Sequence, residues 1–195
     1  MDTASQGVLG RFVRDESPEV VMAPLADATV QQELAILTDR LVAARKDQGG
    51  VTRYRLARML GVSSNSVIDW ESGQESLTVH HLIVWARALM LRVVIVDALG
   101  EQIRGALPRD LGEDWVRYEL RGLMLVLRDV RNAHPRLTQR EVADRARVSR
   151  RSIRRWENLE TSPRTLGFIR WTMALECKVR LAPMQPSRIQ PVVEG

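Results

Sequence analysis

Four arginines lie close together in the second half of the chain as two adjacent pairs, Arg150 with Arg151 and Arg154 with Arg155. The pairs are four residues apart, and residues at that spacing share one face of a helix. A guanidinium can donate two hydrogen bonds to O6 and N7 of guanine, worth roughly 1–3 kcal/mol of base discrimination, and it also binds phosphates. The cluster favours contact with DNA over an arginine-rich surface helix that touches nothing.

No pattern in the sequence indicates a catalytic or metal site. The sequence offers no Ser/His/Asp set, no pair of catalytic carboxylates and no Gly-rich phosphate loop. The single cysteine, Cys177, permits neither a disulfide within the chain nor a Cys-based zinc site. His80 and His81 are adjacent, so they point in different directions and make a poor metal pair. We therefore expect no enzyme activity, no metal and no cofactor.

The positive charge is concentrated in one half of the chain. Net charge is +5, and residues 114–182 carry sixteen basic and eight acidic groups, whereas residues 31–97 carry eight and seven. GC-rich coding explains why 27 of the 29 basic residues are arginine, but it does not explain why the excess falls in one half. The asymmetry favours a polyanionic partner for the second half.

The same composition excludes a membrane span. The chain has no run of eighteen apolar residues. Its acidic N-terminus lacks the basic and apolar segments of a signal peptide. We expect a cytoplasmic protein that is nucleoid-associated when bound to DNA.

The chain contains an internal repeat at a constant offset of 86 residues. Between the first copy, residues 41–95, and the second copy, residues 127–181, fifteen positions are identical. Two of them pair tryptophans, Trp70 with Trp156 and Trp85 with Trp171. Because tryptophan is rare, this coincidence indicates a true duplication.

Each copy has the pattern of a small helical domain. Apolar residues spaced by three and four predict long helices at 30–44 and 116–130. Hydroxyl side chains suited to N-caps open four short helices, at 53–60, 64–72, 139–146 and 150–158, behind Thr52, Ser63, Thr138 and Ser149 respectively. The β-branched run 92–97 and the alternating run 178–182 predict strands that could pair with each other, and Gln102-Ile103-Arg104 could return as a hairpin.

The pattern Thr-x-x-x-Leu/Val-Ala-x-x-x-x-Val-Ser-x-x-Ser-Val/Ile-x-x-Trp-Glu, present at 52–71 and 138–157, resembles the phage-repressor, Cro-like (Xre) helix-turn-helix family. The resemblance implies a mainly α fold of two tandem repressor-like headpieces, each followed by a short β-strand. It also implies structural ion pairs between Arg45 and Glu71 and between Arg131 and Glu157.

The resemblance further implies which residues face DNA. Arg53 and Gln139 would meet backbone phosphates. Base edges would be reached by Ser64 and Asn65 in the first copy and by Arg150 and Arg151 in the second. Asp69 and Arg155 would lie one turn further on the same face, with Arg154 on phosphate. Ser149 completes the DNA-facing set.

Two residues of the second copy depart from the family pattern. Arg147 stands where the first copy has Gly61, and Leu159 stands where it has Gly73. Both glycine positions often require a positive φ, which costs another residue about 1 kcal/mol. The sequence predicts that the local geometry differs there.

This organisation predicts five segments: 1–28, an N-terminal tail; 29–97, the first helix-turn-helix domain; 98–113, a linker; 114–182, the second domain; and 183–195, a C-terminal tail. The leading hypothesis is a sequence-specific transcriptional repressor on double-stranded DNA, acting as a monomeric pseudo-dimer on an asymmetric or pseudo-palindromic operator. The alternative is an antitoxin or accessory protein whose first domain binds a protein partner. An unpaired strand, 92–97 or 178–182, could instead join two chains as a homodimer.

Overall fold

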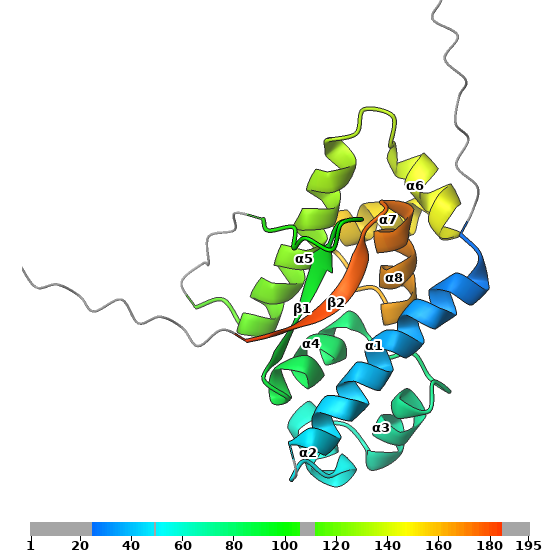
Figure 1. The fold of residues 1–195 in the computed structure, drawn as a ribbon. Coiled ribbons are helices and arrows are strands. Elements are labelled where there is room, and N and C mark those ends of the chain that lie inside the picture. Colours follow the sequence, from blue (N-terminus) through cyan, green and yellow to red (C-terminus); the bar gives the residue numbers. More distant parts are fainter. Residues whose placement is uncertain (1–24, 49, 106–111, 185–195) are drawn as a thin grey trace, which may run out of the picture.

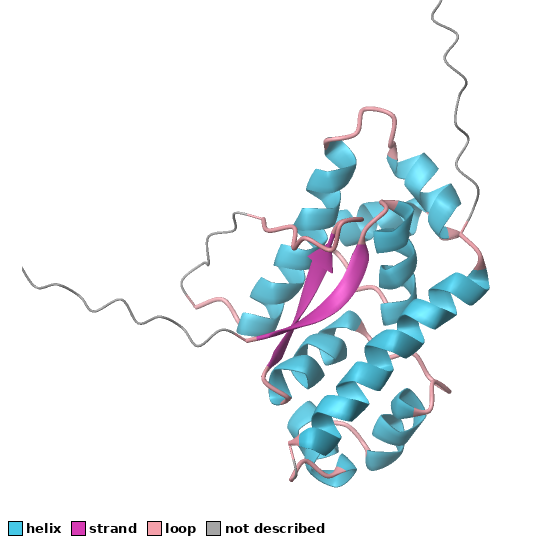
Figure 2. Cartoon of the chain, viewed as in Figure 1, coloured by secondary structure: helices cyan, strands magenta, loops and turns pink. Residues whose placement is uncertain are grey.

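The computed structural model describes residues 25–48, 50–105 and 112–184. Most of the two expected tails and the middle of the expected linker, residues 106–111, lie outside the described residues. The elements of the first copy are α1 (Asp27–Asp47), α2 (Arg53–Leu60), α3 (Ser64–Glu71), α4 (Val79–Ala88) and β1 (Leu91–Val96). Those of the second copy are α5 (Trp115–Asn132), α6 (Gln139–Ala146), α7 (Arg150–Glu157), α8 (Thr165–Ala174) and β2 (Lys178–Pro183). The predicted mainly helical fold is confirmed (Figure 2).

Side-chain caps fix where the short helices begin. Thr52 and Ser63 accept hydrogen bonds from the backbone N–H groups three residues on, and Ser149 does the same. Thr138 forms a full capping box with Glu141. The four N-caps predicted from the hydroxyl pattern are therefore confirmed.

The turns that follow these helices are the same in both copies, against expectation. Gly61 (φ 68°) and Gly73 (φ 73°) are left-handed, and so are Arg147 (φ 52°) and Leu159 (φ 61°). The expectation that the geometry differs at Arg147 and Leu159 is wrong. The helices on each side are fixed by caps and core, so the two side chains accept a strained backbone.

The long helix of each copy is shared with the other copy. At its N-terminal end α1 packs against α8 and β2 of the second copy, and at its C-terminal end against α3 of its own copy (Figure 1). Two ion pairs join α1 to the second copy, Asp27 with Arg170 and Glu33 with Arg180, the latter at 2.6 Å. Helix α5 correspondingly packs on α4, where Arg87 lies 4.0 Å from the Trp115 ring centre. The buried apolar residues of both copies form a single core.

The two strands pair with each other, antiparallel, within the chain (Figure 1). Their register is symmetric under the 86-residue offset, because the pair Val93–Leu181 is converted into the pair Ile95–Val179. Val94 faces its own equivalent, Arg180. A pseudo-two-fold axis therefore passes between these two residues and relates the two copies.

The outer edge of β1 is extended by a short return of the chain. Gln102 forms a bridge with Val96, and the Ile103 N–H donates to the Ile95 carbonyl at 2.9 Å. The predicted hairpin is thus present as a single bridge. Among the described helices, none combines the length and the apolar character needed to cross a membrane.

Candidate nucleic-acid interface

Helix α7 presents its arginines to solvent. Arg150, Arg151 and Arg154 are exposed and line an open hollow of about 400 Å³. Within the described part of the chain none of the three guanidinium groups has a hydrogen bond or ion pair. Arg155 is half-exposed and lies 3.6 Å from Glu160. An eight-residue helix thus carries three cations that the fold leaves without an anion, which is the charge that phosphates and guanine edges attract.

The buried face of α7 explains why the arginines point outward. Ile153 and Glu157 are buried, and the indole of Trp156 packs on Trp171, with ring centres 5.8 Å apart. A helix that buries these positions turns 151 to the opposite side and 154 to the flank, while 150 lies at the exposed first turn of the helix. The core therefore orients the candidate contact residues.

Helix α3 presents a different surface at the equivalent positions. Asn65 is exposed and Ser64 and Asp69 are half-exposed, while Val67 and Trp70 are buried. No cation belongs to this helix. Ile68, which is 43% exposed, lies on the same face as Asn65; sequence reasoning passed over it. The repeat alignment could have pointed to Ile68, because the second copy has Arg154 at the equivalent position. A position that can hold an arginine does not need an apolar residue for the core.

A buried carboxylate locks each recognition helix to its neighbours. Glu71 accepts from Arg45 Nε at 2.7 Å, and its side chain is only 4% exposed. Glu157 accepts from Arg131 Nε at 2.6 Å and is 2% exposed. The expected structural ion pairs are confirmed.

The residues expected on phosphates join these same carboxylates. Arg53 Nε donates to Glu71 at 2.6 Å, and Gln139 Nε2 donates to Glu157 at 2.8 Å. Each side chain therefore ties the first turn of α2 or α6 to the last turn of the following helix. This positioning role was not anticipated, because sequence spacing does not reveal a contact across the turn. A phosphate contact by Arg53 or Gln139 stays a prediction.

The loops that follow the two recognition helices meet across the pseudo-two-fold axis. Thr78 and Arg164, equivalent residues of the two copies, form a β-bridge. On either side of it, the Val79 N–H donates to the Pro163 carbonyl at 3.1 Å, and the Thr165 N–H donates to the Leu77 carbonyl at 2.9 Å. Helices α3 and α7 therefore flank the axis in equivalent orientations.

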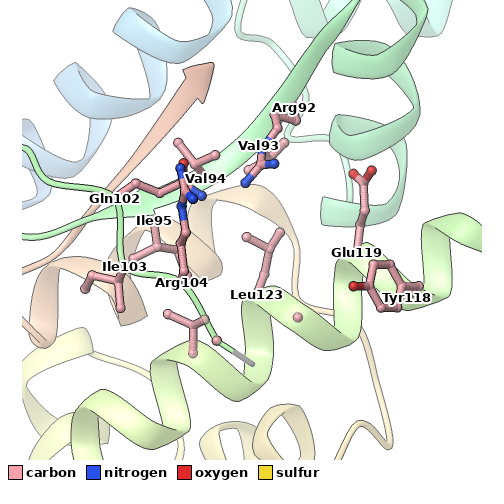
Figure 3. Close-up of a pocket in the computed structure, with 13 residues that line it drawn as sticks. Arg92, Val93, Val94, Ile95, Gln102, Ile103, Arg104, Tyr118, Glu119 and Leu123 are labelled. Atoms are coloured by element: carbon pink, nitrogen blue, oxygen red, sulfur yellow. The ribbon is translucent and has the colours of Figure 1, made fainter. Parts of the chain in front are cut away.

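A second hollow, of about 270 Å³, lies between β1, the return segment and α5 (Figure 3). Apolar side chains such as Ile95 and Leu123 line it, together with Arg92, Arg104 and Glu119. Burial raises the pKa of Glu119, opposed by the charges of Arg87 and Arg92. The residues that line this hollow form no nucleophile–base set, and none belongs to α3 or α7.

The cysteine and the metal-ligating side chains of the described residues add no second candidate site. Burial raises the pKa of the Cys177 thiol to about 11, which keeps it protonated and unreactive near neutral pH. Across the described ranges no three His, Cys, Asp or Glu side chains gather as a metal site.

Comparison with known proteins agrees with this geometry. The model of a family described as helix-turn-helix matches residues 41–91 and 127–177, which together make up more than half of the chain. No curated protein matches the chain, and no solved structure matches it. Because both copies carry the family's short helices, and α3 and α7 stand at its recognition position, the chain belongs to the DNA-binding helix-turn-helix family of Xre/Cro-like type, as a tandem repeat.

Proposed function

We propose that the chain is a transcriptional repressor that binds double-stranded DNA sequence-specifically as a covalent pseudo-dimer. One observation carries the proposal: the pseudo-two-fold axis runs through Val94–Arg180 and Thr78–Arg164, so one chain holds two recognition helices as a symmetric dimer would. In dimers of helix-turn-helix proteins the two helices enter successive major grooves, with half-sites roughly 34 Å apart. One chain then covers one complete operator.

The two halves of that operator differ in sequence. Arg150, Arg151 and Arg155 suit guanine, since arginine pairs with O6 and N7. Asn65 suits adenine N6 and N7, and Asp69 can accept from cytosine N4. The site is therefore pseudo-palindromic in position and asymmetric in sequence, with the tighter half under α7. Arg154 adds affinity through phosphate, which carries no sequence information.

The mechanism is occlusion in the cytoplasm, where the operator lies on the chromosome. A chain seated in two successive grooves excludes polymerase or another factor from the same DNA. The DNA-facing set is Arg53, Ser64, Asn65, Asp69, Gln139, Ser149, Arg150, Arg151, Arg154 and Arg155. Residues 29–97 and 114–182 act as the two DNA-binding domains, here called reading heads, and the long helix of each also packs on the other.

Selection of random duplex DNA by the purified full-length protein tests this proposal, at about physiological salt. We expect one enriched motif with two unlike halves, and one chain per site when the complex is weighed by light scattering. A palindrome bound by two chains would replace the pseudo-dimer with a homodimer of four headpieces. Absence of any motif would remove sequence-specific readout altogether.

A second candidate function rests on the surface of α3, which carries Asp69 and no cation. In that case only the second copy binds DNA and the first copy binds a protein, as in an antitoxin or accessory factor. The double variant Asn65→Ala/Asp69→Ala separates the two functions. Unchanged DNA affinity and motif would favour the protein-binding module, whereas relaxed preference confined to one half-site would favour two reading heads.

A further inference from the structure

Ile68 is an apolar side chain in a place where the fold does not need one. It is 43% exposed, while the core contacts of α3 are made by Val67 and Trp70 on the other side of the helix. The second copy has Arg154 at the equivalent position, with the same local fold. An exposed β-branched residue also lowers helix propensity slightly. Packing and helix formation therefore leave Ile68 unexplained.

The neighbours of Ile68 make this face suitable for contacting bases rather than phosphates. Asn65 lies three residues before it and is exposed, and Ser64 lies four residues before it. Residues at these spacings are neighbours on a helix surface, with Cβ atoms about 5–6 Å apart. The face therefore combines an amide, a hydroxyl and an apolar group, and it contains no cation.

We propose that Ile68 packs against the 5-methyl group of a thymine in the half-site under the first copy. The inference rests on the proposed function, because it requires α3 to lie in a major groove. The thymine methyl is the apolar group that a base pair presents in that groove. Bases are stacked about 3.4 Å apart along a strand, so a side chain one turn from Asn65 reaches a pair within one or two steps of the adenine that Asn65 holds.

The assignment gives the two halves of the operator different recognition chemistry. Under α7 the contacts are hydrogen bonds from guanidinium groups, which pair with guanine and phosphate. Under α3 they are one amide pair with adenine and one apolar contact with thymine. The contacts of Asn65 and Ile68 therefore read A·T pairs, next to the cytosine N4 that Asp69 can accept from. Because α3 carries no cation, the affinity of this half-site depends less on salt than that of the second half-site.

Replacement of thymine by deoxyuridine tests the contact, because it removes the methyl group and keeps every hydrogen-bonding group. The selected duplex serves as the probe, and the half whose base preference relaxes in Arg151→Ala is assigned to the second copy. Each thymine of the other half is then replaced in turn. For the unsubstituted protein we expect one position at which affinity falls roughly fourfold, the effect of losing one buried methyl. With Ile68→Ala the same replacement should have no effect.

Arg154→Ala is the matched control, since it changes the equivalent residue of the other copy. It should weaken binding to both duplexes equally, so that the ratio of the affinities for the thymine and deoxyuridine duplexes stays as in the unsubstituted protein. If the first half is bound and no thymine there is sensitive, or if Ile68→Ala stays equally sensitive, the role of Ile68 is overturned while two-headed binding stands. If the protein shows no base preference outside the second-copy half, both the role of Ile68 and the two-headed function fail.

Discussion

Thr78 and Arg164 occupy the same position in the two copies and form a β-bridge with each other across the pseudo-two-fold axis. The guanidinium of Arg164 also donates to the Ser76 carbonyl at 3.3 Å and lies 3.7 Å from Glu75. A contact between equivalent residues fixes the axis itself. The separation and the relative rotation of α3 and α7 are therefore set by backbone hydrogen bonds close to the recognition helices, and not only by the distant strand pair.

Arg154→Ala should weaken binding to all DNA sequences alike. Its guanidinium is exposed and has no partner among the described residues. If it makes the proposed phosphate contact, its loss lowers the salt slope of log K by about 1. Arg151→Ala, by comparison, should cost about 1–3 kcal/mol on the selected site and relax its specificity. Titrations at several salt concentrations on specific and random duplexes measure both. An unchanged slope in Arg154→Ala would remove this residue from the phosphate contacts.

Leu159→Gly should stabilise the protein by about 1 kcal/mol. Leu159 is exposed and holds a left-handed backbone (φ 61°) that glycine adopts without steric strain. The mirror control is Gly73→Ala, which should destabilise by about the same amount because Gly73 has φ 73° although a Cβ there meets nothing within 4 Å. Urea unfolding of the two variants gives the free energies. If both variants changed the free energy of unfolding in the same direction, the proposed backbone strain at Leu159 would be contradicted.

Glu157→Gln should destabilise the protein by about 3–5 kcal/mol, because a buried ion pair loses one charge. The carboxylate is 2% exposed and accepts from Arg131 and Gln139, so the largely buried guanidinium of Arg131 would be left without an anion. Glu160→Gln, on a half-exposed carboxylate beside Arg155, should change stability by less than about 1 kcal/mol. The free energies of unfolding in urea distinguish the two sites, and a mild effect at Glu157 would show that the lock on α7 is dispensable.

Asp27 should make stability depend on acid pH. A hydrogen bond and charge from Arg170 lower the pKa of this carboxyl below its usual 3.8, with Arg147 acting in the same direction. The stabilisation is therefore complete above pH 3.8 and is lost as the pH falls through the lowered pKa. Asp27→Asn should be less stable than the unsubstituted protein at neutral pH, and the difference should vanish in stronger acid. Asp39→Asn, at an exposed site of the same helix, is the control and should show no such convergence.

Cys177 should resist thiol reagents in the folded protein. Its side chain is buried and its pKa is raised to about 11, so little thiolate forms at pH 8. Labelling with a chromogenic disulfide should be slow without denaturant and fast in concentrated urea. Rapid labelling of the native protein would contradict the burial of this end of the second copy.

The sequence predicts the local structure well because the relevant signals are local. Hydroxyl caps such as Thr52 and Ser149 place helix starts, and the 86-residue offset aligns the copies. The partner of a helix face is not a local property. The spacing of Val116, Leu120 and Leu123 predicts that α5 buries one side, but it does not say that this side meets α4 of the other copy. Only the three-dimensional structure reveals that α5 packs on the other copy.

The candidate site also has features that the sequence predicts and features that it does not. The exposure of Arg151, opposite the buried Ile153 and Trp156, follows from helix periodicity, so the sequence predicts it. The hydrogen bonds from Arg53 and Gln139 to buried carboxylates depend on how two helices cross, and they were not predicted. Retention of left-handed turns at Arg147 and Leu159 was missed for the opposite reason, because a local preference for glycine is outweighed by the surrounding packing.

Because α1 and α5 each pack on both copies, the stability of one helix-turn-helix domain depends on that of the other. We therefore expect the two copies to unfold as one unit. A destabilising change beneath one recognition helix lowers the folded population of both heads together. Surface residues such as Ile68 and Arg154 are therefore free to differ between the two copies, while the interiors beneath them must be maintained as one.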